Sequence, residues 1–202
     1  ESGVKVQEFN SWGGGGIAGI DMNSDNMASG AVNTRLNGSL TLANANKLTY
    51  YTDIRNVNFF LNNLNFKDTN AAAYKQCVGE AYYFRAWFYF NLFKNYGNIA
   101  WLDHTLAPDE NEMNLPQEGR TAMVDHILSD LDKAIDLLSL QNSAATMRVH
   151  KDVARAFKSE VALYEATWEK YHQAKNDAFY DKTVTAAKIK DYLEQCVAAC
   201  KA

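Results

Sequence analysis

From Lys47 onward, apolar residues recur every three or four positions, in blocks separated by polar, glycine-, proline- or asparagine-containing breaks. This spacing gathers apolar side chains on one face of an α-helix, so each block predicts a helix. Gly97 is expected to close the second helix, and Gly119 or Thr121 to begin the third. The pattern predicts an all-α fold with helices at about 47–64, 70–96, 119–140, 149–172 and 183–201.

The second block carries aromatic residues around nearly its whole circumference. A helix that is apolar on all sides is buried on most of them, so we expect it to lie between neighbouring helices. Trp87, and Trp168 in the fourth block, are predicted to pack in the interior. Trp101 follows the second block, and the sequence leaves open whether it faces a partner or folds back over the helices. The aromatic residues of the second block are Tyr82, Tyr83, Phe84, Trp87, Phe88, Tyr89, Phe90 and Phe93.

The fourth block repeats the second at an offset of 75 residues, and the two preceding helices match at an offset of 77. The repeating unit is therefore a helix pair, which is typical of tetratricopeptide repeats, lengthened here by the loop at 97–118. We expect Tyr89 and Tyr164 to be largely buried at equivalent positions. The fifth block would open a third pair, so we expect the natural protein to continue. The register matches Ala81, Tyr82, Tyr89, Phe93 and Tyr96 with Ala156, Phe157, Tyr164, Trp168 and Tyr171.

The first part of the chain has a different composition. Residues 1–46 hold most of the 11 glycines together with many asparagines and serines, which predicts a loop-rich segment. We therefore divide the chain into a loop-rich segment at 1–46 and helical repeats at 47–202.

Charge and cysteine content exclude several classes of protein. The 202 residues carry a formal charge of −4, without the basic excess that nucleic-acid binding requires, so no nucleic-acid partner is expected. The longest apolar stretch, Ala81 to Phe93, contains Arg85 and is too short to cross a bilayer. The three cysteines lack the neighbours of a metal site and are predicted to be packing residues.

Motifs of catalysis and cofactor binding are weak or missing. Gly14, Gly16 and Gly19 have the spacing of a dinucleotide-binding loop, but no helix or further βαβ unit follows. The four histidines are scattered without metal-ligand spacing, and no serine or cysteine lies in a nucleophile elbow. We expect neither a cofactor, nor a metal, nor catalytic activity.

Three segments together resemble one family of proteins. The first has Gly79-Glu80-Ala81, then Arg85-Ala86 among aromatics, and closes with Tyr96-Gly97. The second runs from Gly119 to Ile135, and the third from Arg148 to Tyr164. These motifs are similar to those of the SusD/RagB family, over about residues 46–202. The chain departs from the family around Ala100-Trp101, where a proline is common, and it lacks the family's larger C-terminal half.

The resemblance implies a tetratricopeptide-like fold and a surface-exposed lipoprotein of the outer membrane. Its lipid anchor would lie outside this chain. Such a protein captures oligosaccharides and delivers them to a SusC-like TonB-dependent transporter.

Sugar capture needs an aromatic ring that stacks on a pyranose, and side chains that bond its hydroxyls. The loops of 1–50 offer both, and Asp25 lies where family members often carry an acidic loop. Another interpretation is a helical-repeat scaffold that binds a protein or peptide, for which these loops would be dispensable. The candidate ligand-binding residues are Trp12, Asp25, Asn26, Arg35, Asn44, Asn46 and Tyr50.

Overall fold

The computed structural model describes residues 37–39, 41, 50–65, 68–106, 115–141 and 147–202, and within these ranges it contains five α-helices and no strand. The chain divides into two compact units, residues 1–48 and 49–202. The first unit has few described residues, among them a turn in which Asn37 Oδ1 accepts from the backbone N–H of Ser39 at 3.0 Å. The all-α prediction is confirmed, whereas the predicted loops of 1–46 lie almost entirely outside the described residues.

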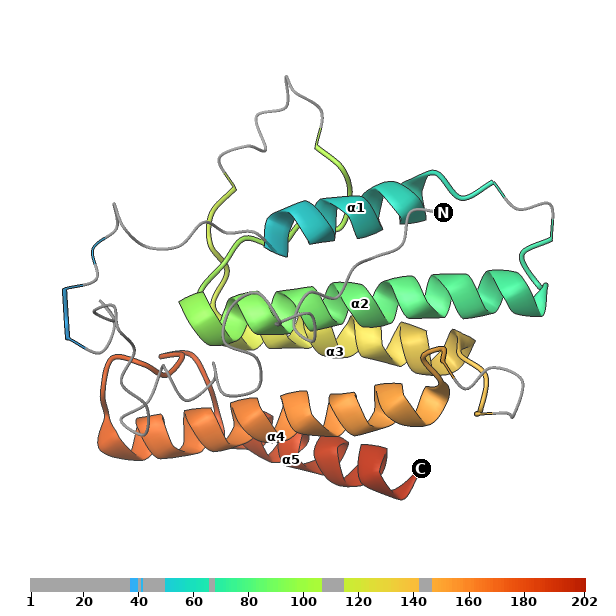
Figure 1. Cartoon of the computed structure of the whole chain (residues 1–202). Helices are drawn as coiled ribbons and strands as arrows, with labels where there is room; N and C mark the ends of the chain where they lie inside the picture. The colour runs from blue at the N-terminus through green and yellow to red at the C-terminus, as the bar shows by residue number, and fades with distance from the viewer. Residues whose placement is uncertain (1–36, 40, 42–49, 66–67, 107–114, 142–146) are drawn as a thin grey trace. The chain divides into compact units, whose positions relative to one another are not determined.

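The helices of the second unit follow the predicted blocks closely (Figure 1). Successive helices pack against one another, as expected for stacked helical hairpins. The helices are α1 (Tyr50–Asn62), α2 (Ala72–Tyr96), α3 (Arg120–Leu137), α4 (Lys151–Lys175) and α5 (Ala186–Lys201).

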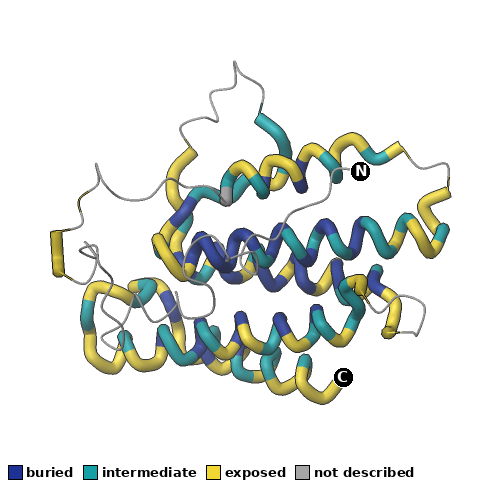
Figure 2. Tube along the Cα trace, viewed as in Figure 1, coloured by how far each residue is buried: buried dark blue, intermediate teal, exposed yellow. Residues whose placement is uncertain are grey.

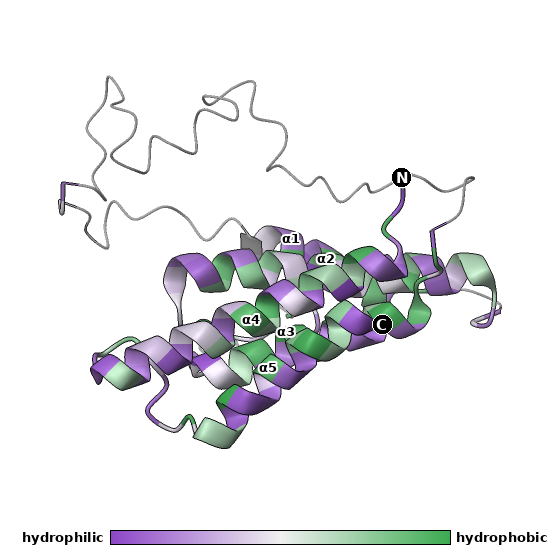
Figure 3. Cartoon of the chain, turned by 90° about the horizontal axis from the view of Figure 1, so that it is seen from below, coloured by the Kyte–Doolittle hydropathy of each residue, from purple (hydrophilic) through white to green (hydrophobic). Residues whose placement is uncertain are grey.

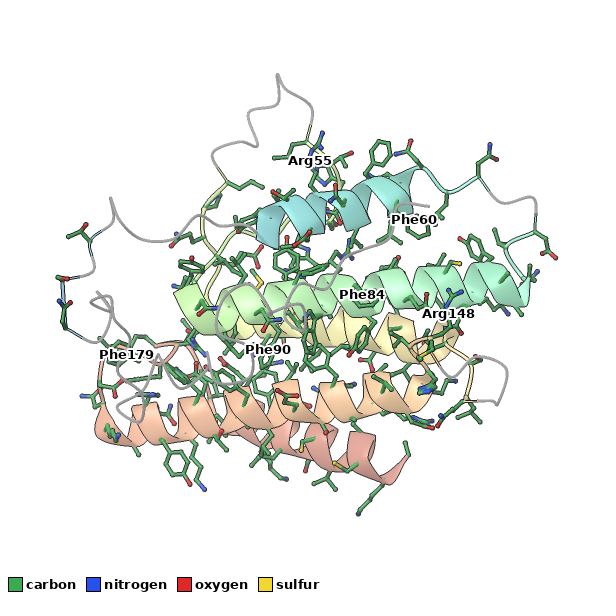
Figure 4. All side chains as sticks on the ribbon, in the orientation of Figure 1. Arg55, Phe60, Phe84, Phe90, Arg148 and Phe179 are labelled. Atoms are coloured by element: carbon green, nitrogen blue, oxygen red, sulfur yellow. The ribbon has the colours of Figure 1, made fainter. Side chains whose placement is uncertain are left out.

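The all-round apolar pattern of α2 is explained by its three neighbours. α2 packs against α1 and α3, and its rings also reach α4, where the centroids of Tyr83 and Phe90 each lie 5.6 Å from that of Phe157. Figure 2 shows buried positions along most of α2, and Figure 4 shows Phe90 between α2 and α4. Trp87 is half-buried and packs on Tyr83 and Phe157, as predicted.

The repeat is real, but its register in α2 and α4 differs by one residue from the predicted offset of 75. Every buried residue of α4 lies 76 positions after a buried residue of α2. Tyr89 is fully buried, as predicted, yet its equivalent is Glu165, and Tyr164 is only half-buried. Matching aromatic side chains misplaced the register because α2 carries them on all sides. The equivalent pairs are Val78 and Ala154, Ala81 and Phe157, Arg85 and Val161, Ala86 and Ala162, Tyr89 and Glu165, Phe90 and Ala166, and Phe93 and Glu169.

Glycines mark two places where the backbone needs them. Gly97 ends α2 with φ +71° and ψ −114°, a conformation that L side chains rarely adopt. Gly79 lies where α2 meets the end of α3, and a Cβ there would stand 2.9 Å from Leu138 Cγ. Gly119 immediately precedes the first residue of α3, and it is one of the two residues predicted to begin this helix. The cysteines are free, but Cys200 is exposed, so its prediction as a packing residue is wrong.

Candidate functional site

The residues predicted to bind ligand are not brought together by the described part of the structure. Tyr50 is the first residue of α1, and only its backbone is described. The other six lie outside the described residues, so the ligand site remains a prediction. They are Trp12, Asp25, Asn26, Arg35, Asn44 and Asn46.

The described residues instead build a fixed loop after α2. We call residues 97–106 the anchored loop. Its start pairs with the strand-like segment before α3, where Glu118 N–H donates to the Ile99 carbonyl at 2.9 Å. This bridge closes the base of the long connection between α2 and α3.

A buried ion pair lies beneath the anchored loop. Arg85 on α2 donates from Nε to Asp130 Oδ2 at 2.6 Å and from Nη2 to Oδ1 at 2.8 Å. Arg85 is 3% exposed and Asp130 1% exposed. Arg85 Nη1 also donates to Asn58 Oδ1 at 3.0 Å and to the Asp103 carbonyl at 3.1 Å. Such a pair is costly to desolvate, and its satisfied geometry offsets that cost.

The remaining bonds of this network also end on loop carbonyls. Asn58 Nδ2 donates to the carbonyls of Leu102 at 2.9 Å and His104 at 3.1 Å. Tyr89 Oη donates to the Leu102 carbonyl at 2.9 Å and accepts from the Leu102 N–H at 2.7 Å. Tyr51 Oη donates to the Ala100 carbonyl at 2.8 Å. α1 and α2 thus fix the loop backbone at four residues.

Trp101 folds back over the helices rather than standing free. Its ring centroid lies 4.2 Å from that of Tyr89 and 4.6 Å from that of His126, and the indole is nearly parallel to the imidazole at 8°. The guanidinium of Arg85 lies 5.3 Å from the Trp101 centroid. Trp101 therefore packs against the core of the helices and is not a free sugar-stacking platform.

The outer side of the anchored loop presents polar groups to solvent. Asp103 has 64% of its side chain exposed, and its Oδ1 lies 2.8 Å from His104 Nδ1. The hydrogen bond from His104 lowers the pKa of Asp103, against the smaller opposing effect of burial. An ionised carboxylate on a fixed backbone can accept hydrogen bonds from ligand hydroxyls or partner N–H groups. Among the described residues, the loop is therefore the best-formed candidate contact surface.

A second set of contacts explains the resemblance motifs at 79–81 and 148–151. Glu80 accepts from Arg148 Nε at 2.7 Å and from Nη2 at 2.6 Å. Gln76 donates to the Val149 carbonyl at 2.7 Å and accepts from Ser139 Oγ at 3.0 Å. These bonds hold the connection between α3 and α4 against α2, near the labelled Arg148 in Figure 4. The motifs are structural here.

Two further classes of site are not found in the described ranges. No group of three or more His, Cys, Asp or Glu side chains there has the geometry of a metal site. None of the described helices combines the length and apolarity that crossing a membrane requires. Trp168 is half-buried against Tyr164 and Arg120, as its predicted packing role requires.

The outer face of α5 keeps a shallow groove. Apolar and polar residues alternate around this helix (Figure 3), and Val197 is 50% exposed. The groove is lined by Lys190, Leu193, Glu194, Val197, Ala198 and Lys201.

The sequence missed the network beneath the anchored loop. Its signal was Arg85, a cation in the middle of an apolar helix, which has to find a buried partner. Which carboxylate would meet it depends on how α2 and α3 pack, and that is set only in the folded chain.

Comparisons with known proteins agree with this architecture. The sequence model of the SusD-like family described as "Starch-binding associating with outer membrane" matches residues 16–163. The chain therefore belongs to the SusD/RagB family. No curated protein matches it significantly.

Solved structures are also similar to this chain. A SusD-like protein from Bacteroides fragilis is 31% identical over 62% of this chain and 24% of its own, with a TM-score of 0.54. A laminarin-binding SusD-like protein is 25% identical over 61% and 27%, with a TM-score of 0.53. A SusD-like carbohydrate-binding protein from B. fragilis, 22% identical over 78% and 33%, shares the fold with a TM-score of 0.64. The chain spans about a quarter to a third of the length of these structures.

Proposed function

We propose that this chain is part of a surface-exposed lipoprotein of the outer membrane that captures oligosaccharides and delivers them to a SusC-like TonB-dependent transporter. The family match over residues 16–163 carries this proposal. The laminarin-binding relative, at 25% identity, supports a glycan as the ligand.

The work is divided between the two parts of the chain. Ligand contacts come from the loops of 1–50, with Trp12 as the stacking face and Asp25 as a hydroxyl acceptor. The helices serve as the rigid part that faces the transporter. The buried network supports this division, because it fixes the anchored loop to α1 and α2 and so makes this part of the helical unit rigid.

The proposed protein binds glycans without cleaving them. Glycoside hydrolysis requires two carboxyl groups placed on either side of the scissile bond. The buried carboxylates Asp130 and Glu165 are each held by an arginine, Arg85 and Arg120, at 2.6 and 2.7 Å. Both carboxyl groups are buried, with Asp130 1% and Glu165 0% exposed, so neither is placed to contact a glycan.

A panel of polysaccharides tests the proposal. The full-length protein, which carries this chain, is run by native electrophoresis in gels that contain laminarin, xyloglucan, starch or no glycan. We expect retardation by at least one glycan and no release of reducing sugar from any. Unchanged mobility in every gel would contradict glycan capture, and released sugar would contradict the binding-only role.

The scaffold interpretation is the second candidate, and the groove on α5 favours it. Its apolar Leu193 and Val197 between charged residues suit an amphipathic helix. If it is correct, Val197→Asp abolishes partner binding, whereas Trp12→Ala has no effect. If the loops of 1–50 capture glycan, Trp12→Ala weakens sugar binding, whereas Val197→Asp leaves it unchanged.

A further inference from the structure

Two buried glutamates share one arginine where α3, α4 and the connection between α4 and α5 meet. Arg120 Nη2 donates to Glu165 Oε2 at 2.7 Å, and Arg120 Nε lies 3.7 Å from Glu169 Oε1. Both glutamates are 0% exposed and Arg120 is 8% exposed. Two carboxyl groups and one guanidinium are therefore held away from water.

Arg120 has little freedom to move in this cluster. Its guanidinium lies 4.2 Å from the ring centroid of Phe93 and 4.4 Å from that of Trp168, so it is held by both rings. As the first residue of α3, it is also fixed by the helix backbone. If the charges of the cluster become unbalanced, a part other than Arg120 has to move.

That part is the connection between α4 and α5. Asp181 N–H donates to the two carboxylate oxygens of Glu169 at 3.1 and 3.0 Å. Asp181 Oδ2 in turn accepts from Thr121 Oγ1 at 2.5 Å. These bonds tie the connection to α3 and to Glu169 on α4. Further along it, Trp168 Nε1 donates to the Phe179 carbonyl at 2.8 Å, and His172 pairs with Asp177 at 2.6 Å. The neighbouring Lys182 and Thr183 are exposed.

The charges balance only when one of the two glutamates carries a proton. With both ionised, two carboxylates face one guanidinium, and Asp181 adds a further negative charge nearby. Burial raises the pKa of Glu165 to about 8, opposed by Arg120 and reinforced by Glu169. Burial also raises the pKa of Glu169. A proton on Glu165 leaves the single carboxylate of Glu169 to balance the guanidinium of Arg120, with Asp181 as the further charge nearby.

We propose that this cluster is a proton-dependent latch. While Glu165 carries a proton, the latch holds the part of the 176–185 segment around Asp181 against α3 and α4. Loss of the proton at alkaline pH opens that segment, because opening it hydrates Glu169 without moving Arg120 or unwinding α4. The labelled Phe179 marks the segment in Figure 4.

The sign of the pH dependence follows from the raised pKa. An unfolded glutamate releases its proton near pH 4.3, whereas folded Glu165 keeps it to about pH 8. Between these values the folded form binds more protons, so its stability falls as pH rises and levels off above pH 8. The latch is therefore closed below neutral pH and opens through pH 8.

Other charged or titratable groups around the cluster are already paired or stay neutral in this range. His172 pairs with Asp177 at 2.6 Å. Burial raises the pKa of Tyr192 well above its usual value, as it does for Tyr164. Lys188 pairs with Asp125 at 2.7 Å.

Hydrogen exchange measured by mass spectrometry at pH 7 and pH 9, corrected for the intrinsic rate, tests the latch. In the protein, we expect protection of peptides from 176–185 to fall about tenfold between the two values, while peptides from 83–93 are unchanged. Glu165→Gln mimics the protonated side chain, so it should abolish the difference. Glu160→Gln, an exposed change on the same helix, should leave it.

If E165Q folds poorly, Glu169→Gln provides the second variant. The amide oxygen of the new glutamine can still accept from Asp181 N–H, and only the carboxylate of Glu165 then faces Arg120. It should also remove the pH difference. An equal loss of protection in E165Q or E169Q, or none in the parent, would overturn the latch. Because neither readout involves glycan, failure here leaves the proposed function standing.

Discussion

Arg85 and Asp130 hold each other by two hydrogen bonds in the interior, and Arg85 Nη1 donates to Asn58 and to the backbone of Asp103. One buried pair thus joins three helices and the anchored loop. Its environment decides how much it contributes, because a buried charge left without its partner is far more costly than an exposed one.

Asp130→Ala is expected to lower the free energy of unfolding by about 3–5 kcal/mol, since it leaves the guanidinium of Arg85 buried and unpaired. Urea denaturation followed by circular dichroism measures this loss. The matched control is Arg148→Ala, which removes an equally well-bonded pair with Glu80 whose arginine is 48% exposed. We expect about 1 kcal/mol for the control. Equal losses would show that burial of the Arg85 pair is unimportant.

Asn58→Ala tests whether the network holds the anchored loop. The change removes the donors to the carbonyls of Leu102 and His104, so we expect faster hydrogen exchange in peptides from 98–106, and a stability loss of about 1–3 kcal/mol. Asn56→Ala, on the exposed side of α1, is the control. Unchanged exchange in the loop would mean that Asn58 does not hold it.

Gly79→Ala probes the close approach of α2 and α3. Its methyl group would meet Leu138 Cγ at 2.9 Å and Leu137 Cβ at 3.2 Å. Overpacking of this kind costs about 1–3 kcal/mol, partly offset by about 1 kcal/mol of helix propensity. Combined with Leu138→Ala, the substitution should become neutral or stabilising. Additive losses in this double-mutant cycle would place the strain elsewhere.

Tyr89 contributes both packing and two hydrogen bonds to Leu102. Tyr89→Ala should therefore cost about 3 kcal/mol or more, and Tyr89→Phe about 1–2 kcal/mol. Thermal and urea unfolding of the two variants separate the ring from the hydroxyl. If Tyr89→Phe costs as much as Tyr89→Ala, the hydroxyl rather than the packed ring dominates.

The helices could be predicted closely because their apolar spacing is local information. The predicted block at 70–96 became Ala72–Tyr96, and that at 183–201 became Ala186–Lys201. The repeat register was wrong by one residue because similarity of side chains was matched, whereas burial defines equivalence. Tyr89, an aromatic residue, therefore corresponds to Glu165, a buried acidic residue.

The partners of the charged residues were beyond sequence reasoning. Arg85 meets Asp130 and Arg120 meets Glu165, each 45 positions apart, only after the helices have packed. For the ligand site, the loops of 1–50 were chosen by composition and by family resemblance, which name suitable chemistry without fixing which residues converge. That site therefore has to be tested by binding.

Calorimetric titration of the full-length protein with laminarin and xyloglucan oligosaccharides tests the central claim most directly, alongside its Trp12→Ala and Asp25→Ala variants. We expect the parent to bind at least one oligosaccharide. Each variant should bind about tenfold or more weakly with an unchanged melting temperature, since a stacking face or a hydroxyl acceptor is lost from a surface loop. A parent protein that binds none of a broad oligosaccharide panel would contradict glycan capture, and equal affinity in both variants would contradict the site.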